Sequence, residues 1–331
     1  MVAILALHRG GRVSRSEAGG KAVHLSALWH LGIPIPSTWV IPVSTFRRLS
    51  RMNQGVSDPS AWTIPDDVIR EWQAVAEEIG VPMAVRSSAC NEDGHQFSFA
   101  GQYDTVLNVR PEGLVAAIRQ CWCSLSANTA YGPTSEHDAM AVVIQPMVDA
   151  AVSGVMFTMN PMNGSWREMS IEAVWGQCEG LVSGQISPHW YLVRRPRGRL
   201  ARIRLSVIQS QVHPIEEQMA PGPDGALEWV SVPKRKQQQP TLRHAELFRL
   251  CRIGMKIQKH FQAPQDVEWA RTAKGDFVVL QSRPITTKAE PRRRTDVVWT
   301  RRFLGERWPN RVSPLGWSLV SPVLEHFIAY P

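Results

Sequence analysis

Cysteine is scarce in this sequence, and no apolar run is long enough to cross a membrane. The chain has five cysteines, an odd number that forms no CxxC pair, which favours reduced thiols over a disulfide framework or a zinc site. The opening residues MVAILALHRGG carry too short an apolar run for a signal peptide, and no stretch of about 18 apolar residues follows. We therefore expect a cytoplasmic protein without a membrane partner.

Several common motifs are also missing. The sequence contains no Walker lysine motif, GxGxxG fingerprint, GxSxG elbow or HExxH helix, which excludes the commonest nucleotide-binding and hydrolase plans. The formal charge is +8, yet no helix-turn-helix, zinc finger or RNA-recognition signature accompanies it. We expect no nucleic-acid partner, and interpret the basic runs as solvated loops or a protein interface.

The 331 residues suffice for two lobes with sizeable cores. Strand and helix patterns alternate along the chain without a single Rossmann run or an internal repeat. Segment 205–240 is rich in proline and glutamine and predicts an irregular insertion. Helices are expected at about Lys21–Leu31, Asp66–Ile79, Pro111–Leu125 and Leu242–Phe261.

The stretch QDVEWARTAKGDFVVLQSRPIT, residues 265–286, predicts a β-hairpin with a four-residue turn at 273–276. In that register Glu268 lies opposite Gln281, and Asp266 lies opposite Arg283. Because side chains alternate along a strand, these four polar residues share one face. The other face is expected to hold Val267, Trp269, Leu280 and Ser282.

The polar face of this hairpin has two interpretations. A carboxylate and an amide oxygen at paired positions are the hard ligands that Mg²⁺ prefers, and an arginine one step away could hold a phosphate. The alternative is a salt bridge across an edge hairpin at the surface. The hairpin alone does not decide between them.

Other segments place polar residues at the ends of apolar elements. Lys21 follows two glycines at a helix start, which suits either a phosphate or an ordinary helix entry. Arg86 ends an apolar strand, where it could bind a ligand or cap carbonyl groups. Gly101 allows close backbone approach, Thr105 offers a hydroxyl, and the amide of Gln145 could meet an adenine edge.

Five segments, in order, carry a resemblance to a known family. They are GGKAVHLSAL…GIPIPSTWVI, MAVRSSA…SFAGQYDTVLNV, VVIQPMV…SGVMFTMNP, IEAVWG…GLVSGQISPHWYLV and PQDVEWA…LQSRPIT. Together they resemble the ATP-binding domain of phosphoenolpyruvate synthase, pyruvate phosphate dikinase and rifampicin phosphotransferase, over about residues 15–290.

The resemblance implies an α+β, ATP-grasp-like fold with ATP clamped between two lobes, residues 1–135 and 136–290. It implies that Glu268 and Gln281 hold Mg²⁺, and that Arg283 acts in catalysis with Arg86 and Lys21. The implied ATP-binding set is Lys21, Arg86, Gly101, Thr105, Gln145, Glu268, Gln281 and Arg283. Phosphoryl transfer needs mainly positioning and charge neutralisation, which such a set supplies.

Two features depart from the family. Gln177 and Cys178 stand in the glycine-rich segment GQCEGLVSG where relatives tend to have a small or apolar pair. The Ser-His signature of the family's swivelling domain does not occur in the chain. Residues 291–331 are similar to the start of an acceptor domain, and we expect them to dock a partner or to pack on their own domain.

The expected function is that of an ATP-binding component that phosphorylates a histidine on a swivelling domain or subunit and releases AMP and phosphate. The acceptor is a small molecule bound on the partner, with a phenol favoured by resemblance to phenylphosphate synthase. The alternatives are the ATP domain of a rifampicin-type phosphotransferase, a nucleotide sensor or scaffold with a dead site, and a carboxylate-amine ligase that forms ADP.

Overall fold

The structure is a computed structural model that describes residues 3–90, 103–128, 139–196, 205–222 and 226–285. The chain divides into two compact units, residues 1–290 and 291–331, and the expected docking tail is the second unit, outside the described residues. Within the described part, no helix combines the length and apolar character needed to traverse a membrane.

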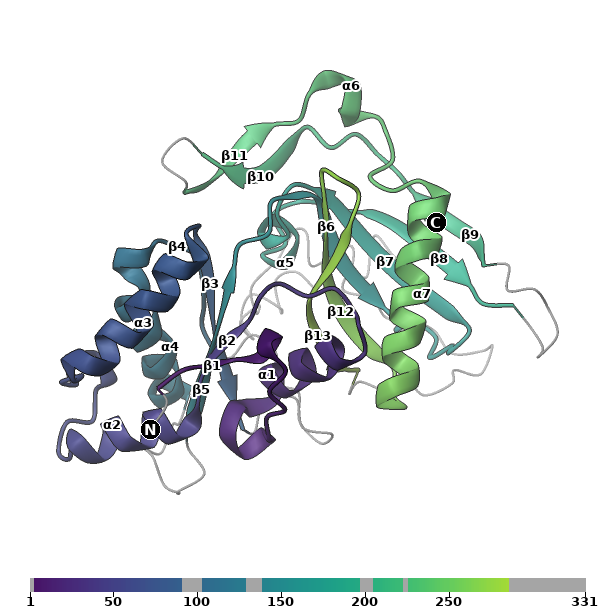
Figure 1. Cartoon of the computed structure of the whole chain (residues 1–331). Coiled ribbons are helices and arrows are strands. Elements are labelled where there is room, and N and C mark those ends of the chain that lie inside the picture. The colour runs from purple at the N-terminus through teal and green to yellow at the C-terminus, as the bar shows by residue number, and fades with distance from the viewer. Residues whose placement is uncertain (1–2, 91–102, 129–138, 197–204, 223–225, 286–331) are drawn as a thin grey trace, which may run out of the picture. The chain divides into compact units, whose positions relative to one another are not determined.

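The first sheet has five strands in the order β1-β2-β5-β3-β4, with antiparallel neighbours throughout (Figure 1). Helix α4 packs on β3 and β4, whereas α1 packs on β3 and β5 and also reaches β13 of the second sheet. The strands are β1 (Leu5–Ala6), β2 (Trp39–Ile41), β3 (Met83–Ala89), β4 (Thr105–Val109) and β5 (Met140–Pro146). The α-helices are α1 (Arg15–His30), α2 (Val43–Met52), α3 (Asp66–Ile79) and α4 (Leu114–Asn128), and the 3-10 turns are Leu7–Arg9, Pro59–Ala61 and Pro111–Gly113.

Aromatic side chains fill the core of this first lobe. Trp72 and Trp122 are fully buried, and the ring of Trp122 lies 5.8 Å from Trp62 and 5.6 Å from Phe46. The spacing of apolar residues along α3 puts Val68, Trp72, Val75 and Ala76 on one face, as a helical period requires. The resulting packing holds β3, which carries Arg86, against a rigid layer.

The second sheet has six strands in the order β13-β12-β6-β7-β8-β9. Helix α7 (His244–Phe261) packs against β12, and its Gly254 lies so close to Met156 and Met169 that a β-carbon there would meet Met156 at 2.5 Å. The strands are β6 (Ala150–Phe157), β7 (Glu168–Trp175), β8 (His189–Arg194), β9 (Ser206–Gln211), β12 (Gln265–Thr272) and β13 (Phe277–Pro284). Two one-turn helices, α5 (Glu179–Val182) and α6 (Lys234–Gln237), complete this part.

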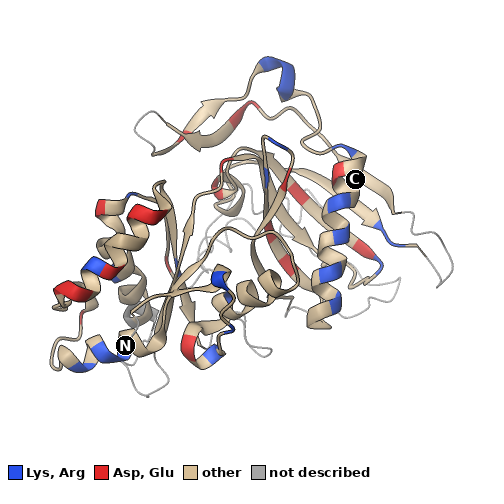
Figure 2. Cartoon of the chain, in the orientation of Figure 1, with Lys and Arg blue, Asp and Glu red and all other residues tan. Residues whose placement is uncertain are grey.

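Charge is distributed unevenly over the helices. Figure 2 shows blue Lys and Arg positions along the ribbon of α7. Its exposed cations are Arg249, Arg252, Lys256 and Lys259. Their spacing places them on one side of the helix, opposite the buried Leu247, Leu250, Cys251, Gly254 and Ile257. This basic face is the solvated side of an amphipathic helix.

The structure confirms the α+β class and corrects one sequence expectation. Segment 205–240 is not irregular: it forms the edge strand β9, a separate hairpin of β10 (Glu217–Pro221) and β11 (Leu227–Ser231), and α6. Proline and glutamine masked the pattern because neither hairpin strand has a buried face of its own. Strand β5 belongs to the first sheet, because it pairs with β2 and β3.

Candidate functional site

A pocket of about 400 Å³ lies between the two sheets. Strands β3, β4 and β5 of the first sheet and β12 and β13 of the second all contribute side chains to its lining. Seven of the residues expected from sequence line it, namely Lys21, Arg86, Thr105, Gln145, Glu268, Gln281 and Arg283. The eighth, Gly101, lies outside the described residues.

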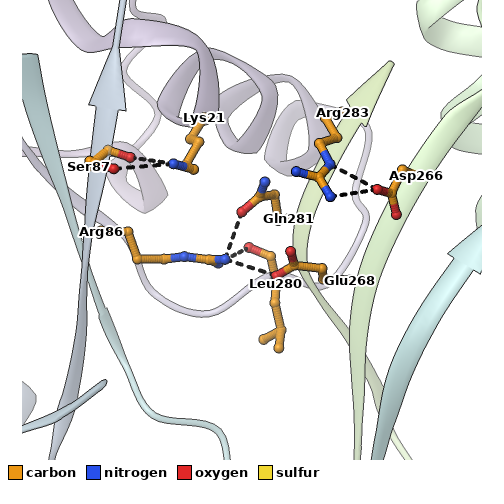
Figure 3. Close-up of polar contacts among 8 residues, drawn as sticks. All are labelled: Lys21, Arg86, Ser87, Asp266, Glu268, Leu280, Gln281 and Arg283. Atoms are coloured by element: carbon orange, nitrogen blue, oxygen red, sulfur yellow. Dashed lines mark hydrogen bonds and ion pairs between the residues drawn. The ribbon is translucent and has the colours of Figure 1, made fainter. Parts of the chain in front are cut away.

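The hairpin forms in the expected register. Glu268 pairs with Gln281 and Asp266 pairs with Arg283, which brings all but one of the polar side chains into the pocket lining (Figure 3). A β-bulge between Glu268 and Trp269 then shifts the pairing. Leu280 is left unpaired at the bulge, and it contributes to the pocket lining, where its backbone oxygen accepts from Arg86.

Arg86 connects the two sheets. Its Nη2 donates to Oε2 of Glu268 at 2.9 Å and to Oε1 of Gln281 at 2.7 Å, while its Nη1 donates to the backbone oxygen of Leu280 at 3.2 Å. Arg86 therefore caps a carbonyl group, which was one interpretation from sequence. It also lines the pocket, where the other interpretation placed it. The two side-chain oxygens converge on one cationic nitrogen.

Glu268 is held in its charged form. Burial alone would raise the pKa of its carboxyl, but the charge and hydrogen bond of Arg86, followed by the charges of Arg283 and Lys21, keep the pKa below its usual value. Its side chain is 21% exposed, so the carboxylate remains accessible from the pocket. An ionised carboxylate beside an amide oxygen is a donor pair that suits a hard divalent cation.

Lys21 lies where α1 passes beside β3. Gly19 breaks the helical geometry of α1 with φ 73°, and a β-carbon there would lie 1.9 Å from the backbone oxygen of Ser88. Glycine thus allows the chain to approach β3 closely enough for the Lys21 ammonium to donate to the backbone oxygen of Ser87 at 2.8 Å. The lysine is 7% exposed and faces the pocket.

Arg283 forms a two-point ion pair with Asp266. Its Nε and Nη2 each lie 2.8 Å from Oδ2 of Asp266. The salt bridge proposed as the simple alternative is therefore present, but Arg283 also lines the pocket. Asp266 fixes the guanidinium on the pocket wall, as a paired carboxylate does for arginine.

The remaining predicted residues come from the first sheet. Thr105 pairs with Arg86 across β3 and β4, and its exposed side chain lines the pocket. Gln145 pairs with Ala84, and its amide nitrogen donates to Oγ1 of Thr38 at 3.0 Å. That contact orients the Gln145 amide at the inner end of β5.

Sequence reasoning missed much of the apolar lining. Pro36, Tyr103, Leu107, Met147, Val148 and Val182 also contact the pocket. Alternation along β4 could have indicated Leu107, two residues after Thr105. Met147 and Val148 lie between β5 and β6, and nothing in their local sequence distinguishes them.

Gln177 and Cys178, the two departures noted from sequence, both line the pocket. The amide nitrogen of Gln177 donates to the backbone oxygen of Val148 at 2.7 Å, which holds that side chain against the connection between the sheets. Burial, with a smaller contribution from the charge of Glu268, raises the pKa of the Cys178 thiol to about 12. Cys178 is therefore a neutral group in the pocket at ordinary pH.

Comparison with known sequences now adds to this geometry. Residues 60–298 match the family described as "Pyruvate phosphate dikinase, AMP/ATP-binding domain", which is more than two thirds of the chain. A probable phosphoenolpyruvate synthase of Methanothermobacter thermautotrophicus is 34% identical, covering 85% of this chain and 45% of that protein. A rifampicin phosphotransferase of Streptomyces sviceus is 34% identical, covering 81% of this chain and 34% of that protein.

A third relative is the prodigiosin synthesizing transferase PigC of Serratia marcescens, 35% identical over 82% of this chain and 32% of its own length. The chain thus spans less than half the length of these relatives. Among solved structures, the biotin carboxylase domain of the Hydrogenobacter thermophilus 2-oxoglutarate carboxylase with MgADP shares 11% identity at a TM-score of 0.37, covering 82% of this chain and 40% of that one. Likeness at that score carries no argument for the site.

Proposed function

Because this chain belongs to the family of pyruvate phosphate dikinase AMP/ATP-binding domains, we propose that it is the ATP-binding component of a dikinase-type phosphotransferase. Its fold is the α+β, ATP-grasp-like arrangement expected of that family, with two sheets around one pocket. In the proposed reaction it phosphorylates a histidine on a separate swivelling domain or subunit and releases AMP and phosphate. The final acceptor is a small molecule on that partner, and we favour a phenol.

One observation carries this proposal: three cations and one convergent pair of oxygen ligands line the same pocket. Lys21, Arg86 and Arg283 supply the positive charge, while Glu268 and Gln281 supply the oxygens. Phosphoryl transfer depends on positioning and on neutralising charge that spreads over phosphate oxygens. A purely structural ion-pair network would not need a cavity of about 400 Å³ at its centre.

The side-chain oxygens of Glu268 and Gln281 are suitable ligands for Mg²⁺. Glu268 is ionised, and its oxygen and that of Gln281 already converge on the cationic Nη2 of Arg86. Within the described ranges, no three His, Cys, Asp or Glu side chains cluster as a metal site. Glu268 and Gln281 would hold Mg²⁺ here, and the ion would neutralise charge on the phosphate groups.

The chain's own residues then have separate tasks. Lys21 and Arg86 hold phosphate oxygens from the side of the first sheet, and Arg86 exchanges its hydrogen bonds to Glu268 and Gln281 for bonds to phosphate. Arg283, fixed by Asp266, stabilises the charge that develops during transfer. The histidine nitrogen of the partner attacks the β-phosphorus, and AMP leaves with the oxygen that joined the α- and β-phosphorus atoms. Water then attacks the γ-phosphorus of the diphosphate on the histidine, which releases phosphate and leaves the β-phosphoryl group on the histidine.

A second candidate follows from the rifampicin phosphotransferase match. Its ATP-binding step uses the same pocket residues, and only the acceptor differs. A nucleotide sensor with a dead site is less well supported, because its pocket would not need an ionised carboxylate beside Gln281. Ligase chemistry would use the same pocket and would form ADP instead of AMP.

The test follows the fate of the β-phosphate. The chain is incubated with Mg²⁺ and ATP labelled at the β-phosphate, together with the histidine-bearing domain of a phosphoenolpyruvate synthase relative and, separately, with extract of its native cells. We expect AMP and acid-labile label on the second protein. ADP as the product, or bound ATP that gives no labelled protein with either source, would overturn the dikinase proposal.

A further inference from the structure

The hairpin β10–β11 lies against the pocket loop Gly176–Val182. Four residues of this loop, Gln177, Cys178, Glu179 and Val182, line the pocket. None of the hairpin residues that the structure describes, 217–222 and 226–231, belongs to that lining. Figure 1 shows it beside α5, which is the end of the loop. Because the hairpin contacts the pocket loop from outside the pocket, it can control the position of that loop.

The first contact is between backbones. The amide nitrogen of Gln177 donates to the backbone oxygen of Met219 at 2.8 Å, and Gly176 forms an isolated β-bridge with Met219. Gly176 has φ 72°, and a β-carbon there would lie 2.3 Å from that same oxygen. The approach therefore needs glycine for its conformation and for its space.

The second contact is made by a side chain. A β-carbon on Gly180 would lie 2.6 Å from Cη2 of Trp229, so the indole ring rests directly on the backbone of α5. Trp229 and Met219 are opposite each other in the hairpin register. One cross-strand pair thus holds both ends of the loop, through a hydrogen bond at Gln177 and a ring at Gly180.

The base of the hairpin is anchored in the core. Ile215 and Val232 are 4% and 2% exposed, and Val232 donates its amide to the oxygen of Glu216 at 2.7 Å. Gln237 of α6 donates its side-chain amide to the oxygen of Val232 at 2.9 Å. A firmly anchored base lets the hairpin transmit position to the loop.

From these contacts we propose that Trp229 is a positioning residue for nucleotide binding, which acts through Gly180 on the pocket loop Gly176–Val182. The inference rests on the proposed function, since it takes the pocket to be the ATP site. Removing the ring frees α5 to move away from the pocket, so Val182 and Glu179 no longer meet the nucleotide at the right distance. The energetic effect falls on ATP binding.

The experiment measures the dissociation constant for ATP by calorimetry on the full chain. Trp229→Ala should weaken ATP binding about tenfold, and Trp229→Phe, which keeps a ring over Gly180, should restore most of the loss. Trp166→Ala is the matched control, because Trp166 is a half-exposed tryptophan that does not line the pocket. Its ATP affinity should equal that of the wild type.

A double-mutant cycle separates positioning from general destabilisation. Gly180→Ala should weaken ATP binding because its new methyl group displaces the ring. In the Trp229→Ala background the same change should cost little more, since the ring is gone and the nearest remaining atom is the flexible end of Ile186 at 3.3 Å. Additive losses, or unchanged affinity in Trp229→Ala, would overturn the inference, whereas a wild-type chain that binds no ATP would overturn the proposed function itself.

Discussion

Nη2 of Arg86 lies 2.9 Å from Oε2 of Glu268, although 182 positions separate the two residues in sequence. Arg86 belongs to β3 of the first sheet and Glu268 to β12 of the second. The side chains are 13% and 21% exposed, so the pair is shielded from water without being sealed from the pocket. This ion pair joins the two sheets at the point where the proposed phosphate chemistry takes place.

Arg86→Ala should weaken ATP binding by about 10- to 100-fold. The change removes a charged donor whose hydrogen bonds are worth about 1.5–3 kcal/mol each. Calorimetric titration with ATP measures the effect, and Arg252→Ala on the exposed face of α7 serves as the control. Equal affinities for the two variants would remove Arg86 from the site.

Glu268→Gln should raise the Mg²⁺ concentration needed for half-maximal ATP binding by about tenfold or more, because a neutral amide is a poorer ligand for a hard cation than a carboxylate. The shape of the side chain is retained, so a loss of packing is avoided. Titration of Mg²⁺ at fixed ATP gives the measurement. The exposed Glu112→Gln is the control, and an unshifted Mg²⁺ curve for Glu268→Gln would place the metal elsewhere.

The register of the hairpin β12–β13 could be predicted from sequence because two local rules determine it. A four-residue turn sets the register, and the period of two assigns each side chain to a face. The pairs Glu268–Gln281 and Asp266–Arg283 follow from these rules and are confirmed. The bulge after Glu268, which leaves Leu280 unpaired, does not follow from them.

No sequence pattern predicts the contacts between the two sheets. The bond of Arg86 to Glu268 depends on how two distant layers pack, and periodicity within either strand does not report it. The hairpin β10–β11 was not predicted from sequence for another reason. Met219 is the one buried residue of its two strands, so the alternation of apolar and polar residues that marks a half-buried strand is missing.

Arg283→Ala should abolish phosphoryl transfer while the chain still folds and binds ATP. We place Arg283 on the charge that develops in transfer, so its loss should reduce the rate by about 100-fold or more and affect the dissociation constant much less. The partner-labelling assay gives the rate, and calorimetry gives the affinity. Arg283→Lys keeps the charge but loses the two-point contact with Asp266, and should restore only part of the rate. Undiminished transfer by Arg283→Ala would end this assignment.

Cys178 should resist alkylation in the folded chain. Burial raises the pKa of its thiol to about 12, so at pH 8 almost none of it is the reactive thiolate. Iodoacetamide treatment followed by mass spectrometry of peptides measures the modification at each cysteine. The same treatment in urea is the control and should modify Cys178 readily. Rapid labelling of Cys178 in the native chain would show that the loop opens to solvent far more than its burial indicates.

The ionised Glu268 should make the free energy of unfolding depend on pH in the acid range. Its pKa is held below the usual 4.5 by Arg86, Arg283 and Lys21 against the opposing effect of burial. A lowered folded-state pKa stabilises the fold above pH 4.5, because the unfolded chain binds the proton first as the pH falls. This contribution disappears as the pH drops from 4.5 through the lowered value. Urea unfolding of the wild type and Glu268→Gln between neutral pH and pH 3 measures it. The free energy of unfolding of the wild type should fall more steeply below pH 4.5 than that of the variant, and parallel curves would show that Glu268 is not stabilised in its charged form.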